Sequence, residues 1–238
     1  MVQDGYESFG KIEQMLGPNA IDRPWDLVFP DFAGGQLWKF LESAPEREEQ
    51  FGRAMKSLEG LGGKSMAADV PFHRFDRFID IGGSLGHFLH KVMKNNPKSK
   101  GILFDRPEVI QNTHKLWFNQ DGEFNKDNGS AHERLELSSG DFFRTDDLPD
   151  AKDGDVFIMR YILHDWSEED CLKILSGLHQ KMNGTKSSLM IGECAIPGKS
   201  GRRRRAYIRC ICILTLQNMY FIILYAIRST SDWFANYA

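Results

Sequence analysis

The fold of this chain is decided by the stretch Phe78-Ile79-Asp80-Ile81-Gly82-Gly83-Ser84-Leu85-Gly86. Its apolar beginning predicts a strand, and its glycines predict a tight turn into a helix that begins near His87. A strand, a glycine-rich turn and a helix in this order present backbone N–H groups to a nucleotide-like ligand in α/β sheets. A glycine-rich turn without a ligand is the plainer alternative, so the motif needs support from the rest of the chain.

Strands and helices alternate from about residue 77 onward. We expect strands at 78–81, 101–105, 134–137, 156–161 and 188–193, with helices at 85–94, 108–117 and 168–182. This alternation predicts an α/β fold with a Rossmann-like, doubly wound, mostly parallel sheet. Ligands of such sheets bind outside the carboxyl ends of the strands. Asp80, Asp105, Asp141 and His164 all fall at or just beyond strand ends, so we expect them along one edge.

The beginning of the chain has a different pattern. Apolar residues at helical spacing predict helices within 1–16, 37–41 and 46–61, separated by prolines and a Gly-Gly pair. We therefore divide the chain into a helical region, residues 1–62, and an α/β domain, residues 63–238.

Composition narrows the function classes. The 238 residues are 41% hydrophobic and 26% charged, as in an ordinary globular protein, and the net charge of -3 argues against nucleic-acid binding. The four cysteines form no CxxC pair and have no histidine at zinc-ligand spacing, so we expect reduced thiols and no metal site. The first twenty residues carry acidic side chains and no apolar run, so we expect a cytoplasmic protein without a signal peptide.

One segment resembles a membrane span. Residues 206–227 are rich in Ile, Leu, Tyr and Cys and follow four arginines at 202–205. Arg209, Gln217 and Asn218 interrupt this segment, and charged groups are costly in lipid. We therefore expect a buried helix that leads into a loop, and no membrane span.

The acidic residues indicate which cofactor the glycine turn serves. Asp105, at the end of the second strand, can accept hydrogen bonds from both hydroxyls of an adenosine ribose, in NAD or in S-adenosylmethionine. Gly82, Gly83 and Gly86 do not form the G-x-G-x-x-G pattern of dinucleotide folds. Asp80, before the turn, suits a ligand with a positively charged amino-acid portion. These residues favour S-adenosylmethionine over NAD.

A second motif, Gly140-Asp141-Phe142-Phe143, follows the third strand. Asp141 can hold the amino group of an adenine while Phe142 packs on its ring. An aspartate that caps a turn beside core phenylalanines is the structural alternative.

The segment Met159-Arg160-Tyr161-Ile162-Leu163-His164-Asp165-Trp166-Ser167-Glu168-Glu169-Asp170-Cys171 closely resembles the catalytic segment of the plant-type small-molecule O-methyltransferases, which include the caffeate and hydroxyindole enzymes. The stretches 79–86, 104–107, 140–143 and 192–197 match further motifs of this family in order. The resemblance implies a class I methyltransferase fold, S-adenosylmethionine as cofactor, and methyl transfer to a hydroxyl of a small aromatic or phenolic compound.

The resemblance also implies roles for single residues. His164 would be the general base, which a phenol needs because its pKa of about 10 leaves it scarcely ionised at neutral pH. Glu193 would orient this histidine. Arg106 and Arg160 would contact the cofactor, although an arginine at a strand end also serves as an ion-pair partner. An NAD-linked reductase would need a Tyr-x-x-x-Lys pair after the fourth strand, and the sequence has none there.

Candidate residues for the acceptor pocket are Met55, Trp166, Asn218 and Met219, because thioether and aromatic walls accept flat substrates. Such side chains at helical spacing also serve as core.

The chain departs from the family in three places. Ser84 stands where a third glycine is usual, which costs little unless the backbone needs a positive φ. Residues 1–62 match only the last helices of the family's N-terminal dimerisation region. We therefore expect a homodimer only if the rest of that region is present in the protein. Ile227 stands at the position of a second catalytic glutamate, and the chain ends before the family's last strands. These departures motivate an alternative, a catalytically impaired cofactor-binding pseudoenzyme with a regulatory or interaction role.

Overall fold

The chain folds into two compact units, Met1–Met66 and Ala67–Ala238, and each is described by itself. The computed structural model describes residues 2–16, 23–34, 36–61, 66–119, 121–122, 124, 132–195 and 208–215. Three residues discussed above, Asn218, Met219 and Ile227, lie outside this part of the chain.

The second unit is built on a six-stranded sheet in the order β3-β2-β1-β4-β5-β6. The first five strands are parallel, and the last pairs antiparallel with β5. This arrangement confirms the predicted Rossmann-like, mostly parallel sheet. The strands are β1 (Arg77–Ile81), β2 (Lys100–Asp105), β3 (Leu135–Ser139), β4 (Asp155–Arg160), β5 (Ser188–Ala195) and β6 (Ile208–Thr215).

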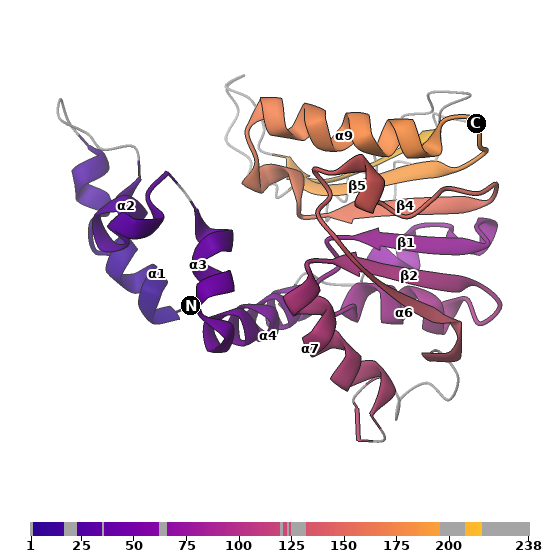
Figure 1. Cartoon of the computed structure of the whole chain (residues 1–238), viewed down its shortest axis with the longest axis horizontal. Coiled ribbons are helices and arrows are strands. Elements are labelled where there is room, and N and C mark those ends of the chain that lie inside the picture. Colours follow the sequence, from indigo (N-terminus) through magenta and orange to yellow (C-terminus); the bar gives the residue numbers. More distant parts are fainter. Residues whose placement is uncertain are drawn as a thin grey trace, which may run out of the picture. The chain divides into compact units, whose positions relative to one another are not determined.

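Helices cover both faces of this sheet. Figure 1 shows α9 (Glu168–Met182) on one side of the strands and α6 (His87–Asn95) and α7 (Pro107–Phe118) on the other. Ile79 and Ile81 of β1 belong to the same buried cluster as Leu178 of α9. Phe78, which precedes Ile79, instead meets Phe72, which also packs against Phe88 of α6. Successive side chains of a strand point to opposite faces, so both faces of β1 are buried.

Short helical turns connect these elements at several places in the second unit. They are α5 (Met66–Asp69), η3 (Phe72–Arg74), η4 (His132–Arg134), η5 (Thr145–Asp147) and η6 (Leu163–Asp165). The last of these, η6, directly follows β4 and carries His164.

The expectation of a buried helix within 206–227 is wrong for the residues that the structure describes there. Residues 208–215 form β6, which extends the sheet beside β5. Its sequence, IRCICILT, has three β-branched isoleucines, and such residues favour strands over helices when a neighbouring strand is available for pairing. Among the described residues, no helix has the length and apolar character that crossing a membrane requires.

The first unit is a set of short helices around aromatic rings. The rings of Trp25, Phe29 and Phe32 pack on one another or on Phe40, with centroids 4.2 to 5.4 Å apart. Residues 24–32, which lie between the predicted helices, form two short helices of their own. The elements are α1 (Val2–Phe9), η1 (Ile12–Met15), α2 (Pro24–Val28), η2 (Pro30–Phe32), α3 (Leu37–Ser43) and α4 (Pro45–Leu61).

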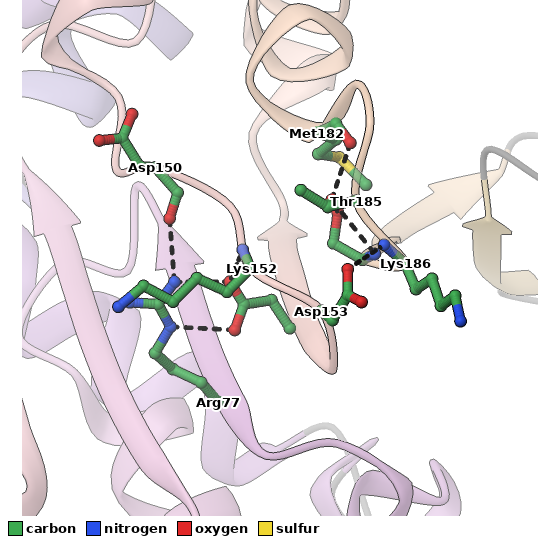
Figure 2. A network of polar contacts seen from close by, with 9 residues as sticks. Arg77, Asp150, Lys152, Asp153, Met182, Thr185 and Lys186 are labelled. Atoms are coloured by element: carbon green, nitrogen blue, oxygen red, sulfur yellow. Dashed lines mark hydrogen bonds and ion pairs between the residues drawn. The ribbon is translucent and has the colours of Figure 1, made fainter.

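A charged network ties β1 to β4 at the amino ends of the strands, the sheet edge opposite His164 (Figure 2). The guanidinium of Arg77 makes two hydrogen bonds to the Asp155 carboxylate, at 2.9 and 2.6 Å, and a third to the Asp150 carbonyl. The Lys152 N–H donates to the same carboxylate at 2.7 Å. The Asp155 side chain is only 2% exposed, and its hydrogen bond with Arg77 raises the pKa of the guanidinium. Both charges of this buried pair are therefore well compensated.

We predict that Asp155→Ala lowers the free energy of unfolding by about 3 kcal/mol, because it leaves a partly buried guanidinium without its carboxylate. The measurement is urea denaturation followed by circular dichroism. Asp150→Ala is the matched control, since it removes an exposed carboxylate that pairs with Lys181, and its urea midpoint should match that of the parent chain. Equal midpoints for the two variants would contradict a structural role for the Arg77–Asp155 pair.

Candidate functional site

The glycine turn after β1 is packed so tightly that a side chain at Gly82, Gly83 or Gly86 would force neighbouring side chains to move. A β-carbon at Gly83 would lie 2.7 Å from the Asp80 carboxylate, and one at Gly82 would lie 2.6 Å from Ile162 Cδ1. Gly82 also has a φ of +70°. The turn backbone therefore lies directly against β1 and against the loop after β4. Asp80 lies beneath it and is 2% exposed.

Helix α7 holds the other end of this turn. The Thr113 hydroxyl lies 3.3 Å from the Ser84 carbonyl, and the Trp117 indole N–H donates to the Leu85 carbonyl at 3.3 Å. Both side chains of α7 are fully buried. These two contacts tie the turn to α7.

Ser84 adopts a left-handed backbone, with a φ of +54°. The sequence left open whether this position needs a positive φ, and the structure shows that it does. A non-glycine residue in this region costs about 1–2 kcal/mol. The serine is therefore a strained substitute for the family's usual glycine.

Asp105 joins the end of β2 to this turn. One carboxylate oxygen accepts the Ser84 N–H at 2.7 Å, and the other accepts the Arg106 N–H at 2.8 Å. Burial raises the pKa of this carboxyl group, and the two backbone donors oppose the rise. Each oxygen can accept one further hydrogen bond, so the group can bind a pair of hydroxyls.

The residues after β3 form a turn beside an aromatic cluster. Asp141 accepts the Phe143 N–H at 2.9 Å, which is the geometry of an aspartate that stabilises a turn. The Trp166 ring packs edge-on against Phe142 and Phe143, with centroids 5.7 and 4.7 Å away. The contacts of Trp166 are therefore those of a packed side chain that joins two loops.

Glu193 of β5 holds the loop after β4 with both carboxylate oxygens. Oε1 accepts the N–H groups of Ile162 and Leu163 at 2.9 and 2.8 Å. Oε2 lies 3.0 Å from Nδ1 of His164. A carboxylate can only accept here, and this contact is shorter than the one between Nε2 and Asp165, so it favours the tautomer with its proton on Nδ1 and Nε2 as the basic nitrogen. The His164 side chain is 53% exposed, whereas that of Glu193 is 17% exposed.

Asp165 is a member of the site that sequence reasoning did not single out. Its Oδ1 lies 3.4 Å from Nε2 of His164. Burial raises the pKa of Asp165, the charge of Glu193 adds to the rise, and His164 opposes it. The only signal in the sequence was its place beside His164. The imidazole thus lies between two carboxyl groups.

The remaining candidates lie in different places. Arg160 ends β4, and its guanidinium carbon is 4.6 Å from the Phe88 ring centroid. Met55 belongs to α4 in the first unit, so its part in an acceptor pocket stays a prediction. Among the described residues, no group of three or more His, Cys, Asp or Glu side chains could hold a metal ion.

Comparison with known proteins assigns the chain to a family. A family model described as an O-methyltransferase domain matches residues 17–220. The chain belongs to the O-methyltransferase domain family. Membership agrees with the fold, because the family motifs quoted above fall on the glycine turn and on the ends of β2, β3, β4 and β5.

Curated relatives are 28–34% identical to this chain over the segments that align. O-methyltransferase 4 of Dictyostelium discoideum is 34% identical over 176 residues, which are 74% of this chain and 46% of that protein. Isoflavone-7-O-methyltransferase 6 of Medicago sativa is 28% identical over 181 residues, 75% of this chain and 46% of that protein. The chain thus spans about half the length of the curated relatives it matches.

Solved structures of methyltransferases share the fold. The mitomycin 7-O-methyltransferase MmcR has a TM-score of 0.65 at 24% identity, over 85% of this chain and 53% of that one. Human N-acetylserotonin methyltransferase, solved in complex with S-adenosylmethionine, has a TM-score of 0.65 at 21% identity, over the same shares.

We predict that Ser84→Gly raises the free energy of unfolding by about 0.5–1 kcal/mol. Relief of the left-handed strain outweighs the extra entropy that glycine gives to the unfolded chain. Ser139→Gly is the control, because Ser139 lies in β3 without a positive φ and glycine there should destabilise by about 0.5–1 kcal/mol. Both values follow from urea denaturation. A loss of stability in Ser84→Gly would contradict the strained turn.

We predict that Glu193→Gln preserves the loop but reverses the tautomer of His164. The amide oxygen can still accept from Ile162 and Leu163, while the amide N–H group faces Nδ1 and favours the imidazole with its proton on Nε2. Nitrogen-15 shifts of the histidine ring report the tautomer. Glu193→Ala should instead lose about 2 kcal/mol of stability, because it removes the acceptor of two backbone N–H groups. Equal stabilities of the two variants would contradict the capping role of Glu193.

Proposed function

We propose that this chain transfers the methyl group of S-adenosylmethionine to a hydroxyl of a small aromatic or phenolic compound, with His164 as general base. The observation that carries the proposal is the pair formed by His164 and Glu193. His164 lies in the loop after β4, and β4 pairs with β1, whose carboxyl end carries the glycine turn. Ile162 of this loop lies against the turn at Gly82.

The residues of the turn fit an adenosyl ligand. Asp105 offers two oxygens to a ribose diol, and Gly82 and Gly83 carry no side chain that would keep a ligand away from the turn backbone. Asp80 and Arg160 would meet the charged amino-acid portion of the ligand, while Arg106, Asp141 and Phe142 would line its adenosine portion. The bound cofactor supplies the electrophilic methyl group. That human N-acetylserotonin methyltransferase binds this molecule supports the proposal.

The imidazole supplies the base. Glu193 keeps the proton of His164 on Nδ1, so Nε2 can accept the proton of the acceptor hydroxyl as its oxygen attacks. The ring then carries a positive charge between the carboxyl groups of Glu193 and Asp165, which stabilise it. A positioned base of this kind contributes about 10²–10⁴ to the rate, and alignment of the acceptor oxygen contributes further.

Names of the relatives support an aromatic acceptor. They include an isoflavone-7-O-methyltransferase and a mitomycin biosynthesis 6-O-methyltransferase, but also an 8-amino-8-demethylriboflavin N,N-dimethyltransferase, 30% identical, from Streptomyces davaonensis. Because the isoflavone and mitomycin enzymes are named O-methyltransferases, we propose a hydroxyl acceptor and treat an amine acceptor as the alternative. Met55, Trp166, Asn218 and Met219 remain the proposed pocket residues. A cytoplasmic location, formation of a homodimer and the absence of nucleic-acid partners also remain predictions from the sequence.

The test joins calorimetric titration of S-adenosylmethionine with a methyl-transfer assay on matched phenols and anilines. We expect binding, turnover of a phenol, and a His164→Ala variant that binds the cofactor normally but turns over about 10²–10⁴-fold more slowly. His114→Ala, which changes an exposed histidine of α7, is the control and should keep both properties. Binding without turnover in the parent chain would favour the pseudoenzyme, and turnover of anilines alone would overturn the hydroxyl acceptor.

A further inference from the structure

Tyr161 is held in a left-handed backbone conformation between β4 and η6. Its φ is +58°, and among the described non-glycine residues only Ser84 shares this region. Its N–H donates to the Gly192 carbonyl at 2.8 Å, which keeps it joined to β5. A bulky side chain rarely adopts this conformation, and strain of this kind tends to lie at ligand clamps and active sites. Glycine would make the same turn without strain, but would supply no ring.

The Tyr161 ring forms one wall around the Arg160 guanidinium. The guanidinium carbon lies 5.2 Å from the centroid of the Tyr161 ring and 4.6 Å from that of Phe88. Both distances fall within the range of attraction between a cation and an aromatic face. Phe88 is 2% exposed in α6 and cannot move without disturbing the core. The guanidinium thus lies against two rings, one buried in the core and one supplied by Tyr161.

The same ring also lies beside the proposed base. Its centroid is 6.3 Å from that of the His164 imidazole, and the two planes meet at 73°. This is the edge-to-face geometry that aromatic rings favour. The Tyr161 ring thus lies beside both Arg160, which we assign to cofactor binding, and His164, the proposed base.

We propose that Tyr161 is a positioning residue, whose strained backbone sets its ring so that Arg160 and His164 keep a fixed relation to each other. The inference rests on the proposed function, because it assigns Arg160 to the cofactor and His164 to the acceptor. It adds a residue that neither the sequence motifs nor the family match singled out. We expect that replacing Tyr161 with a residue that has no aromatic ring removes one of the two ring contacts of the Arg160 guanidinium and thereby weakens cofactor binding.

The first experiment measures the Kd of S-adenosylmethionine by calorimetry in three variants. Tyr161→Ala should raise the Kd about 3–30-fold, the range expected for the loss of a cation–aromatic contact. The conservative variant Tyr161→Phe keeps the ring and should stay within about twofold of the parent chain. In an Arg160→Ala background, Tyr161→Ala should change the Kd by less than about twofold, because the two side chains act through one contact. Additive losses would mean that Tyr161 affects binding through general structure, and would overturn the inference.

The second experiment separates the backbone from the ring. Tyr161→Gly and Tyr161→Ala both lack the ring, but only glycine relieves the left-handed strain. We expect the melting temperature of the glycine variant to exceed that of the alanine variant by roughly 2–4 °C, with a similar Kd in both. A lower melting temperature in the glycine variant would overturn the strained backbone that the inference requires.

The two experiments also distinguish failure of this inference from failure of the proposed function. A parent chain that binds and turns over, with an unchanged Kd in Tyr161→Ala, overturns only the role of Tyr161. A parent chain that binds no S-adenosylmethionine overturns the proposed function and this inference together.

Discussion

The carboxylate of Glu193 is the interaction on which the proposed site depends. One of its oxygens accepts two backbone N–H groups at the start of η6, and the other faces Nδ1 of His164. Because β5 is a buried strand paired with β4, this carboxylate is fixed by the sheet and not by the loop it holds. The loop therefore takes its shape from the sheet, and the histidine takes its orientation from the same group.

A second constraint is steric and acts at the turn after β1. The turn backbone lies so close to Asp80 and Ile162 that a side chain at Gly82 or Gly83 would force them to move. Asp105 then bridges β2 to the turn through the Ser84 N–H. Strain accumulates beside the site, at Ser84 and Tyr161, while the charged pair of Arg77 and Asp155 stabilises the opposite edge of the sheet.

Much of this fold could be predicted because parallel strands and their helices leave strong periodic patterns. Helix α9 begins and ends at the expected residues, and β1 differs from its prediction by a single residue. The prediction failed at β6, where an apolar run has no period that separates a strand from a buried helix. That segment became a strand because β5 offered it an edge to pair with.

The sequence by itself determined the fold class, the family and the order of the motifs along one sheet edge, because these depend on local patterns and on the rule that parallel strands end together. Only the tertiary structure decided which atoms meet there. The contacts of Glu193 with Ile162, Leu163 and His164 join β5 to the loop after β4, and the Asp105 carboxylate joins β2 to the turn after β1. Contacts of this kind leave no periodic signal in a single sequence, since they depend on how the elements pack and not on their local spacing.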